Sequence, residues 1–215
     1  MKTRNAQVRR REVLSWLAQH SGLIQASMAA LTAMIWLVYL HTILAGLRRQ
    51  RRTEILINLG GARDSSACVL VSNLGLEPIY LLEVLLTRWA ADGERITSVA
   101  DRTELAKDQR SSAREATLQG PLCSGDYVEL GSVMDLIERA RLRTPDRLDP
   151  RELREIEITV AAITAADNRV AAATRRFMVC VQDGQMRFLP RDLHARQIRS
   201  RRKRRRIEAA IQDQM

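Results

Sequence analysis

The sequence predicts a membrane-anchored, mainly β protein with one N-terminal transmembrane helix. An antiparallel β-sandwich of immunoglobulin-like architecture, with about seven strands and one short helix, is expected to follow it. The last segment is a basic C-terminal tail whose sequence permits a helix. Three observations carry this prediction: a long uncharged apolar stretch, a series of short apolar runs separated by turn residues, and a concentration of arginine near both ends.

The uncharged stretch is the clearest feature of the chain. Residues 13–47 contain no Asp, Glu, Lys or Arg, and residues 23–47 are mostly Leu, Ile, Ala, Met, Val and Trp. A helix over residues 23–47 would be about 38 Å long, enough to cross a hydrocarbon core of about 30 Å. The alternatives are a buried helix of a soluble protein and a cleaved signal peptide. The signal peptide fits poorly because the run is too long and no small-x-small site precedes Arg48.

Small residues recur along this predicted transmembrane helix at Ala26, Ala30 and Ala33. That spacing is typical of faces through which helices pack in membranes, so we expect association with a partner helix or a second copy of the chain. The preceding basic segment, residues 1–22, is interpreted as a surface-lying interfacial helix.

The net charge of +10 is unevenly distributed. Residues 1–52 carry nine Lys and Arg against one acidic residue, residues 53–186 carry sixteen against twenty-one, and residues 187–215 carry ten against three. A basic globular face for nucleic acid is therefore not supported, whereas basic end segments that meet an anionic partner are.

The central segment, residues 53–186, alternates apolar runs with Gly, Asn, Asp and Pro, which predicts strands joined by short turns. Asp92-Gly93 indicates a hairpin. Ser132 and Asp135 are placed to cap a short helix over residues 132–143. An α+β sheet is the alternative, since residues 78–89 have a sequence that also permits a helix. The expected strands are residues 53–59, 67–73, 78–89, 95–99, 126–130, 156–164 and 170–181.

Two arginine clusters are the candidate contact residues. The juxtamembrane cluster, residues 48–52, comprises Arg48, Arg49, Arg51 and Arg52, and the tail, residues 187–215, contains Arg201, Arg202, Lys203, Arg204, Arg205 and Arg206. Like charges this dense repel one another, so we expect the tail to be disordered until it meets anions. Anionic lipid would contribute about 1 kcal/mol per cation. An acidic protein, a nucleic acid bound without sequence preference and a merely solvated charge run are the other interpretations.

The orientation rests on small differences, because the positive charges on the two sides of the apolar stretch nearly balance. The RRQRR cluster adjoins that stretch directly, and a domain outside the cell would require RRKRRR to cross the membrane. Three scattered cysteines, Cys68, Cys123 and Cys180, do not form a disulfide framework and favour a reducing compartment. We therefore expect a bacterial inner-membrane protein with a cytoplasmic domain.

No catalytic, metal or cofactor motif is recognisable. The three histidines, His20, His41 and His194, lie outside residues 53–186, and no phosphate-binding glycine loop or CxxC pair is present. We expect no enzyme activity, no cofactor and no small-molecule substrate. The expected role is a protein-interaction or assembly module near the bilayer, with a membrane-tethered nucleic-acid or ribosome-binding protein as the alternative.

Overall fold

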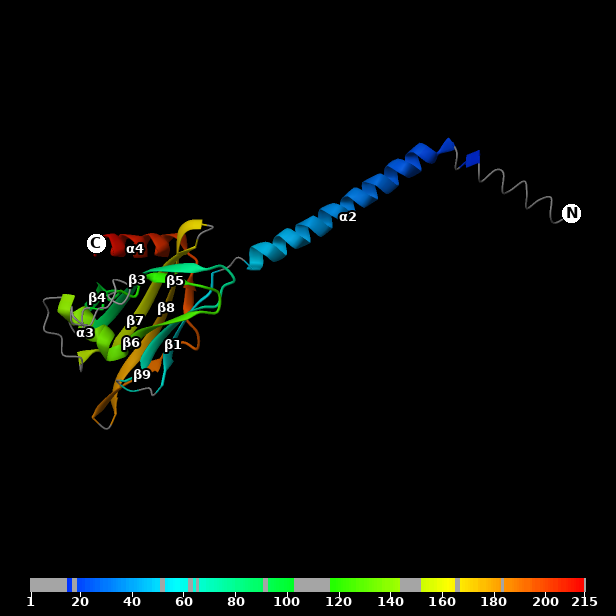
Figure 1. Cartoon of the computed structure of the whole chain (residues 1–215). Helices are drawn as coiled ribbons and strands as arrows, with labels where there is room; N and C mark the ends of the chain where they lie inside the picture. Colours follow the sequence, from blue (N-terminus) through cyan, green and yellow to red (C-terminus); the bar gives the residue numbers. More distant parts are fainter. Residues whose placement is uncertain are drawn as a thin grey trace. The chain divides into compact units, whose positions relative to one another are not determined.

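The chain forms two compact units, Met1–Gln50 and Arg51–Met215, and each is described by itself. Figure 1 shows the course of the chain. The computed structural model describes residues 15–16, 19–50, 53–61, 64, 66–90, 93–102, 117–143, 152–164, 167–182 and 184–214. Side chains are described at all of these positions except 48–50 and 167–169.

The first unit is dominated by α2 (Ser21–Gln50), which contains the predicted apolar helix. Its stretch Ser21–Leu47 is long and apolar enough to cross a membrane, and none of it is buried in the protein. The Thr32 and Thr42 hydroxyls donate hydrogen bonds of 2.8 Å to the carbonyls of Met28 and Val38 in the same helix. Such internal pairing satisfies the polar groups of a helix in an apolar environment.

The remaining expectations for this unit are not tested by a single chain. Packing through Ala26, Ala30 and Ala33 stays a prediction. Most of the interfacial helix expected over residues 1–22 lies outside the described residues, with residues 15–16 and 19–22 helical or in a turn.

In its described residues, the second unit consists of two antiparallel sheets and two helices. The smaller sheet has the order β1-β2-β6, and the larger has the order β10-β8-β7-β3-β4, with β5 paired to β3 and β9 paired to β8. The helices are α3 (Val133–Arg143) and α4 (Arg201–Gln212). The strands are β1 (Ile55–Gly60), β2 (Cys68–Asn73), β3 (Ile79–Ala90), β4 (Gly93–Ser98), β5 (Gly120–Leu122), β6 (Tyr127–Ser132), β7 (Glu155–Thr164), β8 (Asp167–Gln182), β9 (Gln185–Pro190) and β10 (Arg196–Ile198).

The antiparallel β fold predicted from the sequence is confirmed, whereas the immunoglobulin-like topology is not. The run at residues 78–89 is strand β3, so the helical alternative is wrong. This strand pairs with both β7 and β4 and is covered on both faces over residues 83–88, which explains why its apolar residues do not alternate.

The main core lies between the two sheets. Ile57 and Val71 of the smaller sheet pack with Leu86 and Ile158 of the larger one, and Leu136 of α3 joins them, each at most 1% exposed. The predicted start of α3 is confirmed by a reciprocal cap. The Ser132 Oγ accepts from the Asp135 N–H at 3.1 Å, and the Asp135 carboxylate accepts from the Ser132 N–H at 2.8 Å.

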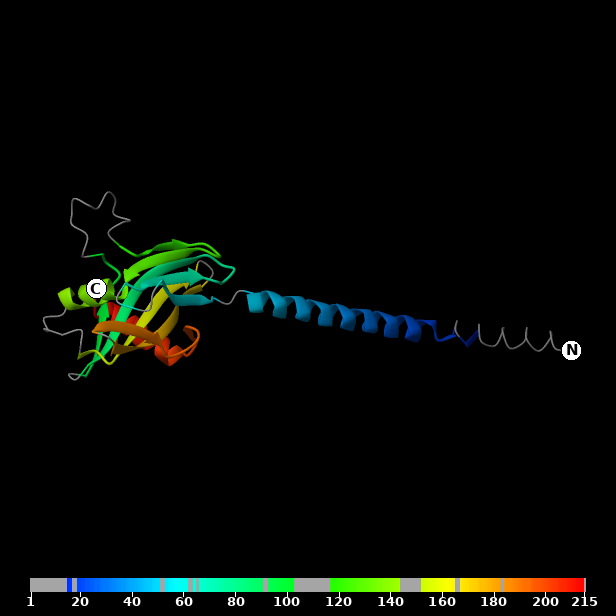
Figure 2. The same cartoon turned by 90° about the horizontal axis from the view of Figure 1, so that it is seen from below.

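The C-terminal segment corrects the expectation of a separate, disordered tail at residues 187–215. Strands β9 and β10 pair with β8, and α4 packs on the face of the larger sheet that points away from the main core (Figures 1 and 2). The contacts use Ile207, Ala210 and Ile211 against Leu85 and other apolar residues of the sheet. These positions are too few and too scattered among arginines to form a recognisable periodic signal, and their partners lie on distant strands.

Candidate functional site

One end of the second unit is organised around the residues that follow α2 in the chain, and we call it the attachment end. Gln197 of β10 holds Ile55 from both sides: its Nε2 donates to the Ile55 carbonyl at 2.7 Å, and its Oε1 accepts from the Ile55 N–H at 3.3 Å. The Glu54 carbonyl accepts from the Leu74 N–H at 2.8 Å. The Glu54 carboxylate lies 3.9 Å from the Arg199 guanidinium. The first residues after the apolar helix are therefore fastened to the segment that leads into α4.

Helix α4 starts at this end with an unusual concentration of positive charge. No acidic residue lies in its first turn, and the side chain of the N-cap, Ser200, makes no capping hydrogen bond. A helix N-terminus already carries about half a positive charge, so cations there raise the local potential instead of neutralising it. The six cations of residues 201–206 thus make this terminus strongly electropositive.

The cations of α4 separate into sets by the face of the helix on which they lie. Arg201, Arg202 and Arg205 are exposed to solvent, and we call them the outer cations. Arg204 is half-buried and donates through Nε to the Ile198 carbonyl at 3.1 Å, so it stabilises the turn into the helix. Lys203 and Arg206 are exposed as well, but unlike the outer cations they line a groove between α4 and the sheet, together with Ile207 and Ala210. We call this pair the groove cations.

Exposed apolar side chains accompany the charge at the attachment end. Leu74 and Leu76 are 56% and 62% exposed, on the turn that joins β2 to β3. Buried Asn73 holds this turn: its Nδ2 donates to the Glu77 carbonyl at 2.9 Å, and its Oδ1 accepts from the Gly75 N–H at 3.0 Å. The leucines are therefore presented on a well-braced turn. Tyr127, 67% exposed, begins the neighbouring strand β6 and pairs with Ser72.

The juxtamembrane cluster predicted from the sequence is only partly described. Arg48 and Arg49 lie in the last turn of α2, and their side chains are outside the described set, as are Arg51 and Arg52 entirely. Glu54 and Ile55, which follow this cluster in the chain, are bonded to the segment before α4.

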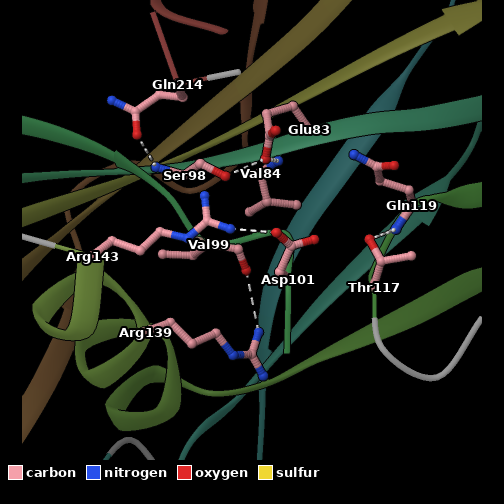
Figure 3. A network of polar contacts seen from close by, with 10 residues as sticks. All are labelled: Glu83, Val84, Ser98, Val99, Asp101, Thr117, Gln119, Arg139, Arg143 and Gln214. Carbon is pink, nitrogen blue, oxygen red and sulfur yellow. Dashed lines mark hydrogen bonds and ion pairs between the residues drawn. The ribbon is translucent and has the colours of Figure 1, made fainter. Parts of the chain in front are cut away.

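A second polar cluster lies at the edge of the larger sheet, near the C-terminus of the chain (Figure 3). Glu83, 8% exposed, accepts from the Val84 N–H and from the Ser98 hydroxyl, each at 2.9 Å. Burial raises the pKa of this carboxyl above its ordinary value, although both hydrogen bonds act in the opposite direction. The Ser98 N–H donates at 3.5 Å to the Gln214 side chain, which connects the end of α4 to β4.

Two arginines of α3, Arg139 and Arg143, belong to the same cluster and stabilise the packing of this helix. Arg139 is the largest fully buried side chain among the described residues, and its Nη1 donates to the carbonyls of Leu130 and Val99 at 2.9 and 3.4 Å. Arg143 forms an ion pair with Asp101 (Figure 3). The contacts of Arg139 and Arg143 link α3 to β6 and to the residues that follow β4, and those of Glu83 link β3 to β4, so the cluster braces the fold.

The nucleophiles and metal ligands of the described residues do not assemble into a reactive centre. Cys68, Cys123 and Cys180 are free thiols. Burial and the neighbouring Glu129 carboxylate raise the pKa of Cys68 to about 11, which keeps this thiol protonated at neutral pH. Within the described part of the chain, no group of three His, Cys, Asp or Glu side chains is placed to hold a metal ion. His194 lies exposed between β9 and β10, so one histidine does belong to the folded domain, contrary to expectation.

Comparisons with protein families, with curated proteins and with solved structures find no match to this chain.

Proposed function

We propose that this protein is a single-pass bacterial inner-membrane protein whose β-sandwich domain, on the cytoplasmic side, binds proteins or assembles with other copies close to the bilayer. In this proposal the attachment end contacts anionic lipid. The observation that carries it is the pair of hydrogen bonds between Gln197 and Ile55, since they bring the start of the polybasic helix to the point where the chain leaves for α2.

The tether between α2 and the domain is short. Residues 51–54 separate Gln50 from β1, and four extended residues span at most about 14 Å. With α2 in the bilayer, the attachment end would therefore be held near the headgroups. This proximity would give the outer cations Arg201, Arg202 and Arg205 about 1 kcal/mol each against an anionic leaflet.

Leu74 and Leu76 support the same orientation. A surface that combines exposed leucines with surrounding cations is typical of proteins that lie on a membrane interface, because the apolar side chains enter the headgroup boundary while the cations remain at its surface. Scattered single exposed leucines would need no explanation, but these two lie on one turn directly bonded to Glu54.

The protein-interaction part of the proposal rests on confinement and on small residues in α2. An anchor restricts encounters to the membrane plane and raises the effective concentration of partners. The alternative, nucleic-acid binding through α4, has less support. Residues 199–214 contain no Phe, Tyr or Trp on which bases could stack.

The test uses the full chain reconstituted in nanodiscs of either zwitterionic or partly anionic lipid. We expect hydrogen exchange of the amides in residues 201–212 to slow in the anionic discs, because lipid contact stabilises the helix. The exchange should recover in high salt, because salt screens the attraction. The variant Arg201→Gln/Arg202→Gln/Arg205→Gln should abolish the difference. Helix α3, on the other side of the larger sheet, is the internal control. Equal exchange of α4 in both kinds of disc would overturn the lipid-contact proposal.

Membrane topology is tested separately, with a compartment-dependent reporter fused after Met215 and, in a second fusion, before Met1. A cytoplasmic signal from the C-terminal fusion supports the proposed orientation. A periplasmic signal would reject it and would also exclude nucleic acid as a partner.

A further inference from the structure

A groove runs along α4 where this helix crosses the larger sheet. Its wall is the sheet-facing side of α4, with Lys203, Arg206, Ile207 and Ala210, and its volume is about 170 Å³. Its floor and far rim come from five strands, β3, β4, β7, β8 and β10. The floor and rim residues are Leu85, Thr87, Glu94, Ile96, Glu157, Thr159, Thr174, Arg176, Arg196 and Ile198.

Three threonines form the polar part of the groove floor. Thr159 and Thr174 are direct cross-strand neighbours, and Thr174 is paired with Arg196 on the next strand. Thr87 lies on β3, opposite Glu157. Thr159, Thr174 and Thr87 are 5%, 8% and 5% exposed, and all three line the groove. The buried side-chain atoms that lack a hydrogen-bond partner among the described residues do not include these hydroxyls, so the hydroxyls are open to the groove. They are therefore available to donate hydrogen bonds to a polar ligand there.

The charge of the groove shows which kind of ligand fits. Arg176 pairs with Glu157 at 2.6 Å and lies over the Trp89 ring, so these two charges neutralise each other. Arg196, Lys203 and Arg206 make no ion pair with any described residue, and Glu94 is the remaining carboxylate at the rim. Four cations against two carboxylates leave an excess of two positive charges.

We propose that this groove binds a phosphate monoester. Such a group carries a charge between about −1.5 and −2 at neutral pH, which matches the excess. Its oxygens would accept hydrogen bonds from the Thr159 and Thr174 hydroxyls and charge-assisted bonds from Arg196 and the groove cations Lys203 and Arg206. Ile96, Ile207 and Ala210 would contact the carbon part of the ester, for which the groove has room.

The groove is distinct from the lipid-contact surface of the proposed function. The outer cations Arg201, Arg202 and Arg205 do not line it, so the site holds whether or not the attachment end meets lipid. The phosphate monoester has two sources, a soluble metabolite and the headgroup of phosphatidic acid in the bilayer. The test also distinguishes both of these ligands from an acidic segment of a partner protein.

The test measures the affinity of glycerol 3-phosphate for the full chain in zwitterionic nanodiscs by isothermal titration calorimetry, with empty discs as the blank. The variant Thr159→Val/Thr174→Val preserves side-chain shape and charge and should weaken binding by about tenfold or more, because a charge-assisted hydrogen bond contributes about 1.5–3 kcal/mol. The variant Lys203→Gln/Arg206→Gln should weaken it at least as much.

The matched comparison is Arg202→Gln/Arg205→Gln, which removes the same net charge from the outer side of the same helix. We expect its affinity for glycerol 3-phosphate to change by less than about twofold, the size of a weak screened interaction, whereas its lipid-dependent hydrogen exchange should decrease. If each variant affects only one of the two measurements, the groove and the lipid-contact surface are separate sites. A loss of groove binding equal to that of Lys203→Gln/Arg206→Gln would overturn the proposal, as would an unchanged affinity in the threonine variant. Circular dichroism establishes that each variant is folded.

A second arm identifies the source. Competition by discs that contain phosphatidic acid, lost in the threonine variant, assigns the lipid headgroup, and its absence assigns a soluble ester. No binding of either phosphate ester, together with threonine-dependent binding of an acidic peptide, would reject the phosphate site.

Discussion

The two faces of the larger sheet are covered in different ways. Its inner face packs against the smaller sheet and α3 through one continuous apolar core, in which Phe177, Ile158 and Val160 are completely buried. The outer face has a small apolar cluster beneath α4. It also carries the buried Glu83, the threonines of the groove and ion pairs such as that between Arg176 and Glu157. The difference indicates that the inner face provides most of the stability, while the outer face retains polar groups that a purely structural surface would not need.

The largest effect is expected from an inner-face substitution. Phe177→Ala removes a fully buried ring and should lower the free energy of unfolding by about 3–5 kcal/mol. Thermal unfolding in detergent, followed by circular dichroism, measures the change. The matched control is Met178→Ala, the next residue on the same strand, which points to the outer face and is 47% exposed. A comparable loss in both variants would contradict the division of roles between the faces.

A smaller and more local effect is expected beneath α4. Ile211→Ala removes the most buried side chain of this helix and should destabilise its contact with the sheet by about 2 kcal/mol. We expect faster hydrogen exchange in residues 201–212 with little change elsewhere, since the inner core remains intact. Gln212→Ala, an exposed neighbour, is the control. If exchange quickened equally in β7 and β8, the outer cluster would be part of the global core.

Replacing the buried Glu83 carboxylate should increase stability at neutral pH, whereas the two substitutions above decrease it. Because burial raises the pKa of Glu83, the folded domain binds this proton more tightly than the unfolded chain does. Its stabilising contribution is complete below the unfolded pKa of about 4.3 and is lost as the pH rises through the folded pKa. Glu83→Gln should therefore raise the melting temperature at neutral pH, and the gain should vanish in acid. The nearby Asp101 and Arg143 charges are unchanged in this variant. A lower melting temperature at neutral pH would show that the Glu83 charge is stabilising.

The smallest effect is expected at an exposed outer-face ion pair. Arg191 lies 3.0 Å from Glu155, and its side chain is 56% exposed. Arg191→Gln should cost less than about 1 kcal/mol, because solvent screens the pair and ordering the long side chain costs entropy. A double-mutant cycle with Glu155→Gln measures the coupling. A coupling above that range would mean that the outer face contributes more to stability than its packing suggests.

The sequence predicted the elements whose signal is local. An uncharged stretch of the length of α2 has few interpretations, and the start of α3 was recognisable because Ser132 and Asp135 stand three residues apart in a capping pattern. Strands β1, β2 and β7 were located within about two residues, the usual uncertainty of strand and helix boundaries. Strands β5, β9 and β10 were missed, because they are short or polar and depend on neighbouring strands for their hydrogen bonds.

The candidate surface was only half predictable. Arg201 to Arg206 were identified by their charge density alone, and so were the juxtamembrane arginines. Leu74 and Leu76 gave no signal, since an exposed leucine and a buried one look the same in a sequence. The sequence also gave no indication that Thr159, Thr174 and Thr87 share a groove, because strand pairing alone brings them together.

By itself, the sequence determined that one helix is apolar enough to cross a membrane, that an antiparallel β domain follows, and that positive charge gathers near both ends of the chain. These properties depend on composition and on spacings of a few residues. Only the tertiary structure decided that the polybasic segment is a packed helix and that it begins beside Ile55, 142 residues from Gln197 in the chain. The physical reason is that long-range pairing depends on which strands become neighbours, a result of the packing of the whole core that no local pattern encodes.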